Sequence, residues 1–328
     1  MKAQLENQAS IAEDQPRFDA NPGKNGYCWW YLDAISDDRQ HALTVIAFIG
    51  SVFSPYYRRA RSLGPSDPEN HCSINVALYG AGGKRWAMTE RGHGDLVQGK
   101  DVLQVGPSSL RWDGEAIEIE INEITVPIPT RLRGKIRVVP TVFNSRQFAL
   151  HKHQRHHWQP VFPGARVEVD FTDPELRWQG QGYFDTNSGG APLEQDFNSW
   201  HWSRTHDSDG NVTVFYDRIS SDLDRNCLAL EIAADGCVTS VTAPPEVRLP
   251  NTGLWKIARS TRGDFGQHQP RIKTLEDTPF YARTQIEFEQ SGKPVIAVHE
   301  SLSMTRFTNP LVQLMLPFKM PRWASKQD

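Results

Sequence analysis

The 328-residue sequence predicts an all-β protein made of two barrel-like or sandwich halves in tandem. Three observations lead to this prediction. Short runs rich in β-branched and aromatic residues follow one another closely, with glycine, proline, asparagine and aspartate between them. Helical patterns are few and short. The length also exceeds the ~250–300 residues at which single cores stop growing, which favours two domains.

The N-terminal part begins with a polar segment, residues 1–26, which has no apolar run. We therefore expect a disordered tail rather than a signal peptide or a folded element. Residues 27–165 form the first predicted half. Its strand-like runs are 28–35, 42–49, 73–80, 84–90, 115–121 and 135–140. The sequence AGGK at 81–84 indicates a hairpin turn between two of these runs.

Residues 166–328 form the second predicted half, and the boundary is expected somewhere within 145–180. The strand-like runs of this region are 165–171, 175–185, 211–217, 227–233, 237–241, 254–259, 278–289 and 294–304. Short helices are expected at 55–62, 192–200 and 311–318. A single large sandwich is the alternative architecture.

Composition excludes several classes of function. A net charge of -3 provides no basic footprint for nucleic acid. The longest apolar run, residues 42–53, is shorter than the about 20 residues that span a bilayer, so a soluble or peripheral cytoplasmic protein is expected. The sequence contains no P-loop, GxSxG or HExxH motif. Its four cysteines lack CxxC spacing, which favours free thiols over a zinc site or a disulfide framework: Cys28, Cys72, Cys227 and Cys237.

The strongest candidate site combines an H-x-W pattern with a Y-x-D pattern. Alternate residues of a strand share a face, so His156 and Trp158 point one way, as do Tyr183 and Asp185. If the two faces meet, proton donors and an aromatic wall line one pocket. The alternatives are a buried hydrogen-bonded network without chemistry, or four residues that never meet. Spacing alone favours these alternatives.

Other histidines and tryptophans have a structural and a functional interpretation. His151 and His153 form an HxH pair, but no further ligand cluster accompanies them, which favours a solvated loop over a metal site. Trp200 and Trp202 flank His201 and would share one face of a strand. Such aromatic residues are usually core, although they also suit a cleft for an apolar or planar ligand.

The C-terminal stretch 309–326 mixes an apolar run with basic residues and a tryptophan, namely Lys319, Arg322, Trp323 and Lys326. This mixture is typical of a membrane interface. A helix docked on a barrel explains it equally well.

Several long motifs point to one family. They are GYCWWYLDAISDD, LTVIAFIGSVFSPYY, NVALYG and GGKRWAMTERG, GYFDTN, FNSWHWSR, TLEDTPFYAR and AVHESLS. Together, over about residues 26–322, they resemble the carotenoid 1,2-hydratases, also called hydroxyneurosporene synthases. The resemblance implies two lipocalin-like barrels. It also implies cofactor-independent addition of water across the terminal C1=C2 bond of an acyclic carotenoid such as neurosporene or lycopene, giving a tertiary alcohol.

The resemblance further implies that the catalytic residues are His156, Trp158, Tyr183 and Asp185. His157 is an alternative to His156, and the H-x-W spacing favours His156. Protonating an alkene requires a neutral acid, so Asp185 must lie in an apolar environment that raises its pKa. His156 would hydrogen-bond this acid or deprotonate the incoming water.

The implied substrate is dissolved in the membrane. This gives residues 309–326 a role in peripheral contact with the inner or photosynthetic membrane of a photosynthetic bacterium. The sequence predicts no oligomeric state.

Two other functions compete with hydration. A lipocalin-like carrier would bind an apolar ligand but has no reason to keep an ionisable acid in its cavity. A sugar-active enzyme would need two carboxylates across a cleft, whereas the aromatic set contains one acid.

Overall fold

The computed structural model describes residues 9–11, 15–80, 83–263, 265, 270–290 and 293–323. The all-β prediction is confirmed, with 57% strand and 11% helix. Two compact units are present. Unit 1 comprises Met1–Pro192 with Leu314–Asp328, and unit 2 comprises Leu193–Gln313. The range 145–180, in which the sequence placed a boundary, lies inside unit 1.

Unit 1 is built on an antiparallel sheet that ends in one short parallel pairing. Its strands are β1 (Ala9–Ile11), β2 (Tyr27–Ser36), β3 (Ala42–Ile49), β4 (Cys72–Tyr79), β5 (Arg85–Arg91), β6 (Leu96–Gly99), β7 (Val102–Val105), β8 (Ser108–Trp112), β9 (Ile117–Ile124), β10 (Arg131–Val142), β11 (Arg146–Ala149), β12 (His156–Asp173), β13 (Glu175–Gly189) and β23 (Arg322–Trp323). Its helices are α2 (Pro55–Leu63), η1 (Pro68–Asn70), η2 (His93–Asp95) and η3 (Leu316–Phe318).

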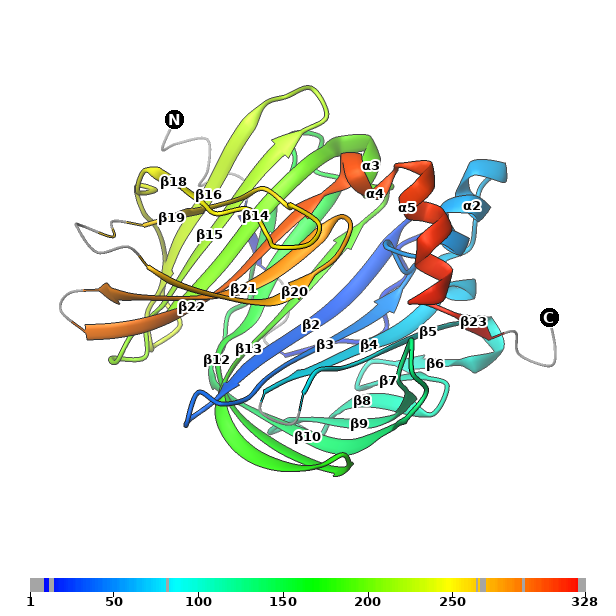
Figure 1. Ribbon diagram of the computed structural model, residues 1–328, viewed down its shortest axis with the longest axis horizontal. Helices are drawn as coiled ribbons and strands as arrows, with labels where there is room; N and C mark the ends of the chain where they lie inside the picture. Colours follow the sequence, from blue (N-terminus) through cyan, green and yellow to red (C-terminus); the bar gives the residue numbers. More distant parts are fainter. Residues whose placement is uncertain are drawn as a thin grey trace. The chain divides into compact units, whose positions relative to one another are not determined.

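The strand order of this sheet is β23-β5-β4-β3-β2-β13-β12-β10-β9-β8-β7-β6, with β11 on β12 and β1 on β11. The sheet curls until β4 contacts β7 and β5 contacts β9, and Figure 1 shows this curl below the labels of β2 and β3. Strands β12 and β13 are long because they extend from the curled part to the part beside β2.

Alternation along the strands gives the sheet two different buried faces. One face carries the apolar core of unit 1, which includes Trp30, Leu32, Val45, Val76 and Phe184. The opposite face of β2 and β13 is also buried but contains polar side chains, among them Asp33 and Asp185. Buried carboxyl groups need hydrogen-bond partners, so this second face is where a site is expected.

The expected tail at 1–26 differs from the structure in its second part. Residues 1–8 and 12–14 lie outside the described residues. Phe18, however, is fully buried and packs against Trp30 with ring centroids 5.5 Å apart. Its backbone N–H also donates to the carbonyl of Lys100 at 3.0 Å. A single aromatic anchor in a polar stretch gives no periodic signal, so composition alone did not reveal it.

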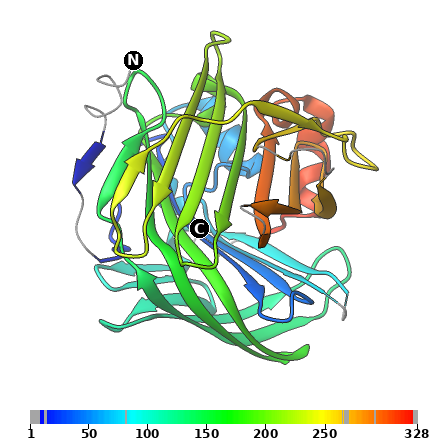
Figure 2. The same ribbon diagram turned by 90° about the vertical axis from the view of Figure 1, so that its left-hand side faces the viewer.

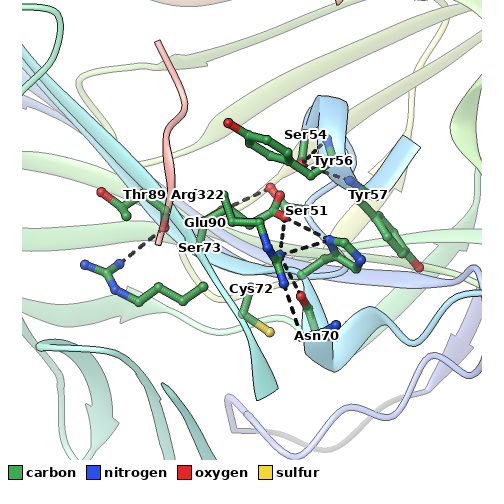
Figure 3. A network of polar contacts seen from close by, with 12 residues as sticks. Ser51, Ser54, Tyr56, Tyr57, Asn70, Cys72, Ser73, Thr89, Glu90 and Arg322 are labelled. Atoms are coloured by element: carbon green, nitrogen blue, oxygen red, sulfur yellow. Dashed lines mark hydrogen bonds and ion pairs between the residues drawn. The ribbon is translucent and has the colours of Figure 1, made fainter. Parts of the chain in front are cut away.

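The C-terminal segment joins unit 1 through a buried ion pair. Strand β23 pairs in parallel with β5, which places Arg322 opposite Glu90. As Figure 3 shows, the Arg322 guanidinium donates to Glu90 Oε1 at 2.5 Å and to the carbonyl of Asn70 at 2.9 Å. His71 Nδ1 lies 2.8 Å from the same carboxylate oxygen. Glu90 is fully buried, so its charge depends on these partners.

Unit 2 contains a seven-stranded antiparallel sheet of order β17-β16-β15-β14-β22-β21-β20 and a separate β18–β19 pair. Its strands are β14 (Phe197–His206), β15 (Val212–Ser220), β16 (Arg225–Ile232), β17 (Val238–Ser240), β18 (Glu246–Leu249), β19 (Arg259–Arg262), β20 (Arg271–Asp277), β21 (Tyr281–Gln290) and β22 (Lys293–Ser303). The helices are α3 (Leu193–Asp196), α4 (Met304–Phe307) and α5 (Pro310–Met315), which runs into unit 1. Figure 2 shows β14, β15 and β16 side by side in yellow-green.

The Arg322–Glu90 pair yields a stability prediction. Arg322→Ala should lower the apparent free energy of unfolding by about 3 kcal/mol, because it leaves the buried Glu90 charge with one fewer donor. Arg177→Ala is the matched control, since it breaks an ion pair with Asp170 in which both side chains are mostly exposed. This control should change stability by at most about 1 kcal/mol. Urea unfolding followed by circular dichroism measures both, and equal effects would contradict the role assigned to Arg322.

Candidate active site

Strands β12 and β13 bring the predicted catalytic residues onto one buried face of unit 1. His156 lies opposite Gly189 and Trp158 lies opposite Asn187. Both therefore share the face that Tyr183 and Asp185 occupy on β13. Trp158, Tyr183 and His156 are fully buried, and Asp185 is 4% exposed.

The Asp185 carboxyl group is the acceptor at the centre of this set. Trp158 Nε1–H donates to its Oδ2 at 2.8 Å, and the Tyr183 hydroxyl donates to the same atom at 2.9 Å. Both donors end on Oδ2, so Oδ1 is the oxygen on which a neutral acid would carry its proton. The indole and phenol would also stabilise an ionised carboxylate at this position. The geometry therefore suits a buried acid that delivers a proton from Oδ1.

His156 lies farther from Asp185 than the sequence pattern suggested. Its Nδ1 is 2.9 Å from the Tyr27 hydroxyl, and the two rings stack with centroids 5.8 Å apart. In the pairing of β12 with β13, His156 lies opposite Gly189. Gly189 is four residues from Asp185, which corresponds to about 13 Å along a strand. His157 is on the opposite face and half-buried, and partial desolvation lowers its pKa.

A second tyrosine–aspartate pair belongs to the same face, and the sequence analysis missed it. Tyr31 and Asp33 of β2 repeat the Y-x-D spacing of β13, and the Tyr31 hydroxyl donates to Asp33 Oδ2 at 3.1 Å. Asp33 is 1% exposed. The antiparallel register places Asp33 opposite Tyr183 and Tyr31 opposite Asp185. The signal was the YLD triplet at 31–33, inside a run that was interpreted only as a strand.

The residues predicted to bind substrate lie in unit 2, on both faces of β14. Trp200 and Trp202 share one face and are buried. His201 lies on the other face, where its Nδ1 is 2.8 Å from the Ser301 hydroxyl and its ring stacks on His299 at 6.2 Å. The three side chains therefore do not form one cluster.

Within the described part of the chain, no group of three or more histidine, cysteine, aspartate or glutamate side chains is arranged to hold a metal ion. All four cysteines are free. Burial raises the pKa of the Cys28 thiol to about 12, so this thiol stays protonated. His151 is buried rather than solvated, with its ring 5.0 Å from that of His153.

Comparisons with known proteins agree with this fold. Residues 45–328 match the family model of the carotenoid hydratase CrtC. The acyclic carotenoid 1,2-hydratase of Thiocapsa roseopersicina is 53% identical over 307 residues, which cover 94% of this chain and 76% of that protein. The enzyme of the same name from Rubrivivax gelatinosus is 46% identical over 314 residues, with the same shares covered.

Among solved structures, the crystal structure of a putative AttH from Nitrosomonas europaea has the same fold. Its TM-score is 0.59 at 12% sequence identity, with 89% of this chain and 96% of that chain covered. The lipocalin-like fold and the family resemblance predicted from the sequence are confirmed.

The histidine pair of unit 2 yields a pH prediction. Desolvation lowers the pKa of His299 from 6.5 to about 3, and its Nε2–H donates to the carbonyl of Ser260 at 2.8 Å. Between these pH values the unfolded chain binds a proton that the folded chain does not. The stability from His299 is therefore complete above pH 6.5 and is lost as the pH falls towards 3, at about 1 kcal/mol per pH unit.

The variant His299→Gln keeps an amide donor for Ser260 but cannot titrate. Its free energy of unfolding should therefore fall less steeply between pH 6.5 and pH 4.5 than that of the unsubstituted protein. Urea unfolding at several pH values measures both slopes, and parallel profiles would contradict the assignment.

Proposed function

The chain belongs to the CrtC family of carotenoid hydratases, which are hydro-lyases, and from this membership we propose that it hydrates the terminal C1=C2 double bond of an acyclic carotenoid. The product is a 1-hydroxy-1,2-dihydro tertiary alcohol. Neurosporene and lycopene are the proposed substrates. The observation that carries the proposal is the buried Asp185 carboxyl group, with two donors on one oxygen and an aromatic wall around it.

The first proposed step is proton transfer from Asp185 Oδ1 to C2 of the alkene. The two π electrons form the new C–H bond, and C1 becomes a tertiary cation. A water molecule then bonds to C1 and loses one proton, which leaves the alcohol. The reaction consumes one water, and the proton lost by that water replaces the proton that Asp185 gave to the alkene. The proposed reaction therefore needs no cofactor. In the proposed starting state Asp185 carries its proton, and the Trp158 and Tyr183 donors stabilise the carboxylate that the step leaves behind.

Aromatic faces support the proposed cation. A cation over an aromatic ring gains about 0.5–2 kcal/mol, and Trp158 and Tyr183 flank the acid on the same face. Trp200 and Trp202 remain the proposed contacts to the apolar polyene in unit 2. His201 would act at most indirectly, because its side chain lies on the other face of β14.

A route to a membrane-dissolved substrate is proposed through the C-terminal segment of unit 1. In the described residues no helix is long and apolar enough to cross a bilayer. Leu314, Phe318 and Trp323 are nevertheless 70%, 79% and 53% exposed, and Lys319 lies beside them over the Trp86 ring. Exposed apolar side chains next to a lysine suit insertion at a membrane surface. We propose peripheral contact with the membrane at this segment.

Hydration is tested with lycopene in detergent micelles and no added cofactor, followed by mass analysis of the carotenoid. The expected product has gained one water. Asp185→Asn should reduce turnover by at least 100-fold, because an amide cannot replace the acid, while binding of lycopene persists. Substantial turnover by the variant would refute the acid role. Binding without any conversion by the unsubstituted protein would instead identify a lipocalin-like carrier.

Membrane contact is tested by co-flotation with vesicles of mixed zwitterionic and anionic phospholipids. The double variant Leu314→Gln/Phe318→Gln should lower the partition coefficient onto the vesicles at least tenfold, since burying such a side chain is worth about 1.5–3 kcal/mol. These substitutions leave the Arg322–Glu90 pair intact. The control is Leu63→Gln on α2, which changes a leucine that is 80% exposed outside this segment. Equal flotation of all three proteins would rule out the proposed contact.

A further inference from the structure

Two Y-x-D motifs face each other across the β2–β13 pair, and the proposed function uses only one of them. We propose that Asp33 is a second catalytic carboxylate, which holds the water that attacks C1 and accepts its proton. This inference rests on the proposed hydration and assigns the step that follows protonation by Asp185.

The register places the two carboxyl groups on a diagonal of one face. Asp33 is opposite Tyr183, and Asp185 is opposite Tyr31. Residues on such a diagonal have Cα atoms about 7–8 Å apart. Each tyrosine donates to the aspartate of its own strand, at 3.1 Å on β2 and 2.9 Å on β13. The two tyrosine rings also touch edge to face, with centroids 6.3 Å apart.

Two carboxyl groups on neighbouring strands of one buried face suit a reaction in which one gives a proton and the other activates water. Enzymes that protonate a leaving group while a carboxylate activates water keep their two carboxyl groups apart, so that water and substrate fit between them. Alkene hydration has the same demands at neighbouring atoms, with a proton arriving at C2 and water arriving at C1. A carboxyl group much closer to Asp185 would share its proton instead of leaving space for water.

One further polar group on this face is suited to hold a water molecule beside Asp33. Thr44 lies opposite Asp33 on β3 and is 1% exposed. Among the described residues, Thr44 Oγ1 has no hydrogen-bond partner. Buried groups of this kind usually bind water or a ligand. The Thr44 hydroxyl beside the Asp33 carboxyl group provides two of the contacts that an ordered water needs.

Asp33 is better placed than His156 to accept the proton. His156 is in register with Gly189, four residues from Asp185, whereas Asp33 is in register with Tyr183, two residues away. These offsets correspond to about 13 Å and about 7 Å along a strand. The His156 ring also contacts Tyr27 at 2.9 Å, which fixes its orientation beside Tyr27.

The proton balance closes over one turnover. Asp185 loses a proton to C2, and Asp33 gains one from the water as its oxygen bonds to C1. The product therefore leaves with Asp33 protonated and Asp185 ionised. Return of that proton from Asp33 to Asp185 restores the starting state.

The test is lycopene turnover in D₂O, because it separates protonation from water attack. Asp33→Asn should slow hydration at least 100-fold but still exchange deuterium into C2 of recovered lycopene, since Asp185 can protonate the alkene and take a proton back. Asp185→Asn should lose both hydration and exchange. Asparagine has the shape of aspartate and can accept the Tyr31 hydrogen bond, so the fold is expected to persist.

Three further variants provide controls. Thr44→Val should slow hydration and keep exchange, whereas Thr44→Ser, which retains the hydroxyl, should restore hydration. Asp37→Asn, at an exposed ion pair with Arg166, should hydrate normally. These variants keep the proposal testable even if Asp33→Asn fails to fold.

Three results would overturn the proposal. The first is normal hydration by Asp33→Asn. The second is loss of exchange together with hydration in a folded Asp33→Asn that still binds lycopene, which would place Asp33 in proton delivery. The third is equal hydration by Thr44→Val and Thr44→Ser. If the unsubstituted protein showed neither hydration nor exchange, the proposed function itself would be refuted. The proposed role of Asp33 would then be refuted as well.

Discussion

The pairing of β2 with β13 is the constraint on which the candidate site depends. These strands are about 150 residues apart in the sequence, yet they align over ten residue pairs from Gly180–Ser36 to Gly189–Tyr27. A shift of one residue would turn the acids of one strand to the opposite face. The pairing is held by the apolar side chains on the reverse of the same strands, among them Leu32 and Phe184. Packing of the apolar face therefore determines which polar side chains lie together on the opposite face.

The same sheet serves two purposes because its faces differ in composition. The core face is filled by aliphatic and aromatic residues, which contribute most of the stability of unit 1 through burial. The polar face holds carboxyl, phenol and indole groups that are buried but bonded to one another. Such a network is expensive if one member is lost. This cost keeps the side chains in fixed orientations, which the proposed proton transfer to a defined carbon atom would require.

The sequence predicted the class of the fold more completely than the arrangement of its strands. Period-two patterns revealed most strands, because they depend on neighbouring residues. The unit boundary did not appear in such patterns, since β12 and β13 run continuously through the range where a change of domain was expected. In the candidate site, the H-x-W and Y-x-D patterns named three residues that the structure brings together by hydrogen bonds, namely Trp158, Tyr183 and Asp185. Asp33 was missed because its relation to Asp185 exists only through long-range pairing, which no local pattern records.

In the proposed mechanism, the hydrogen bonds of Asp185 resolve a difficulty in using a buried carboxyl group as a strong enough acid. Desolvation favours the protonated form of a carboxyl group but also makes it reluctant to release its proton. The Trp158 and Tyr183 donors act mainly on the charged product of that release, because bonds to an ionised acceptor are about twice as strong as neutral ones. In the proposed step, their contribution therefore grows as the proton moves from Asp185 to the alkene. A residue that only bonded the neutral acid would lower its reactivity, so the position of both donors on Oδ2 matters more than burial alone.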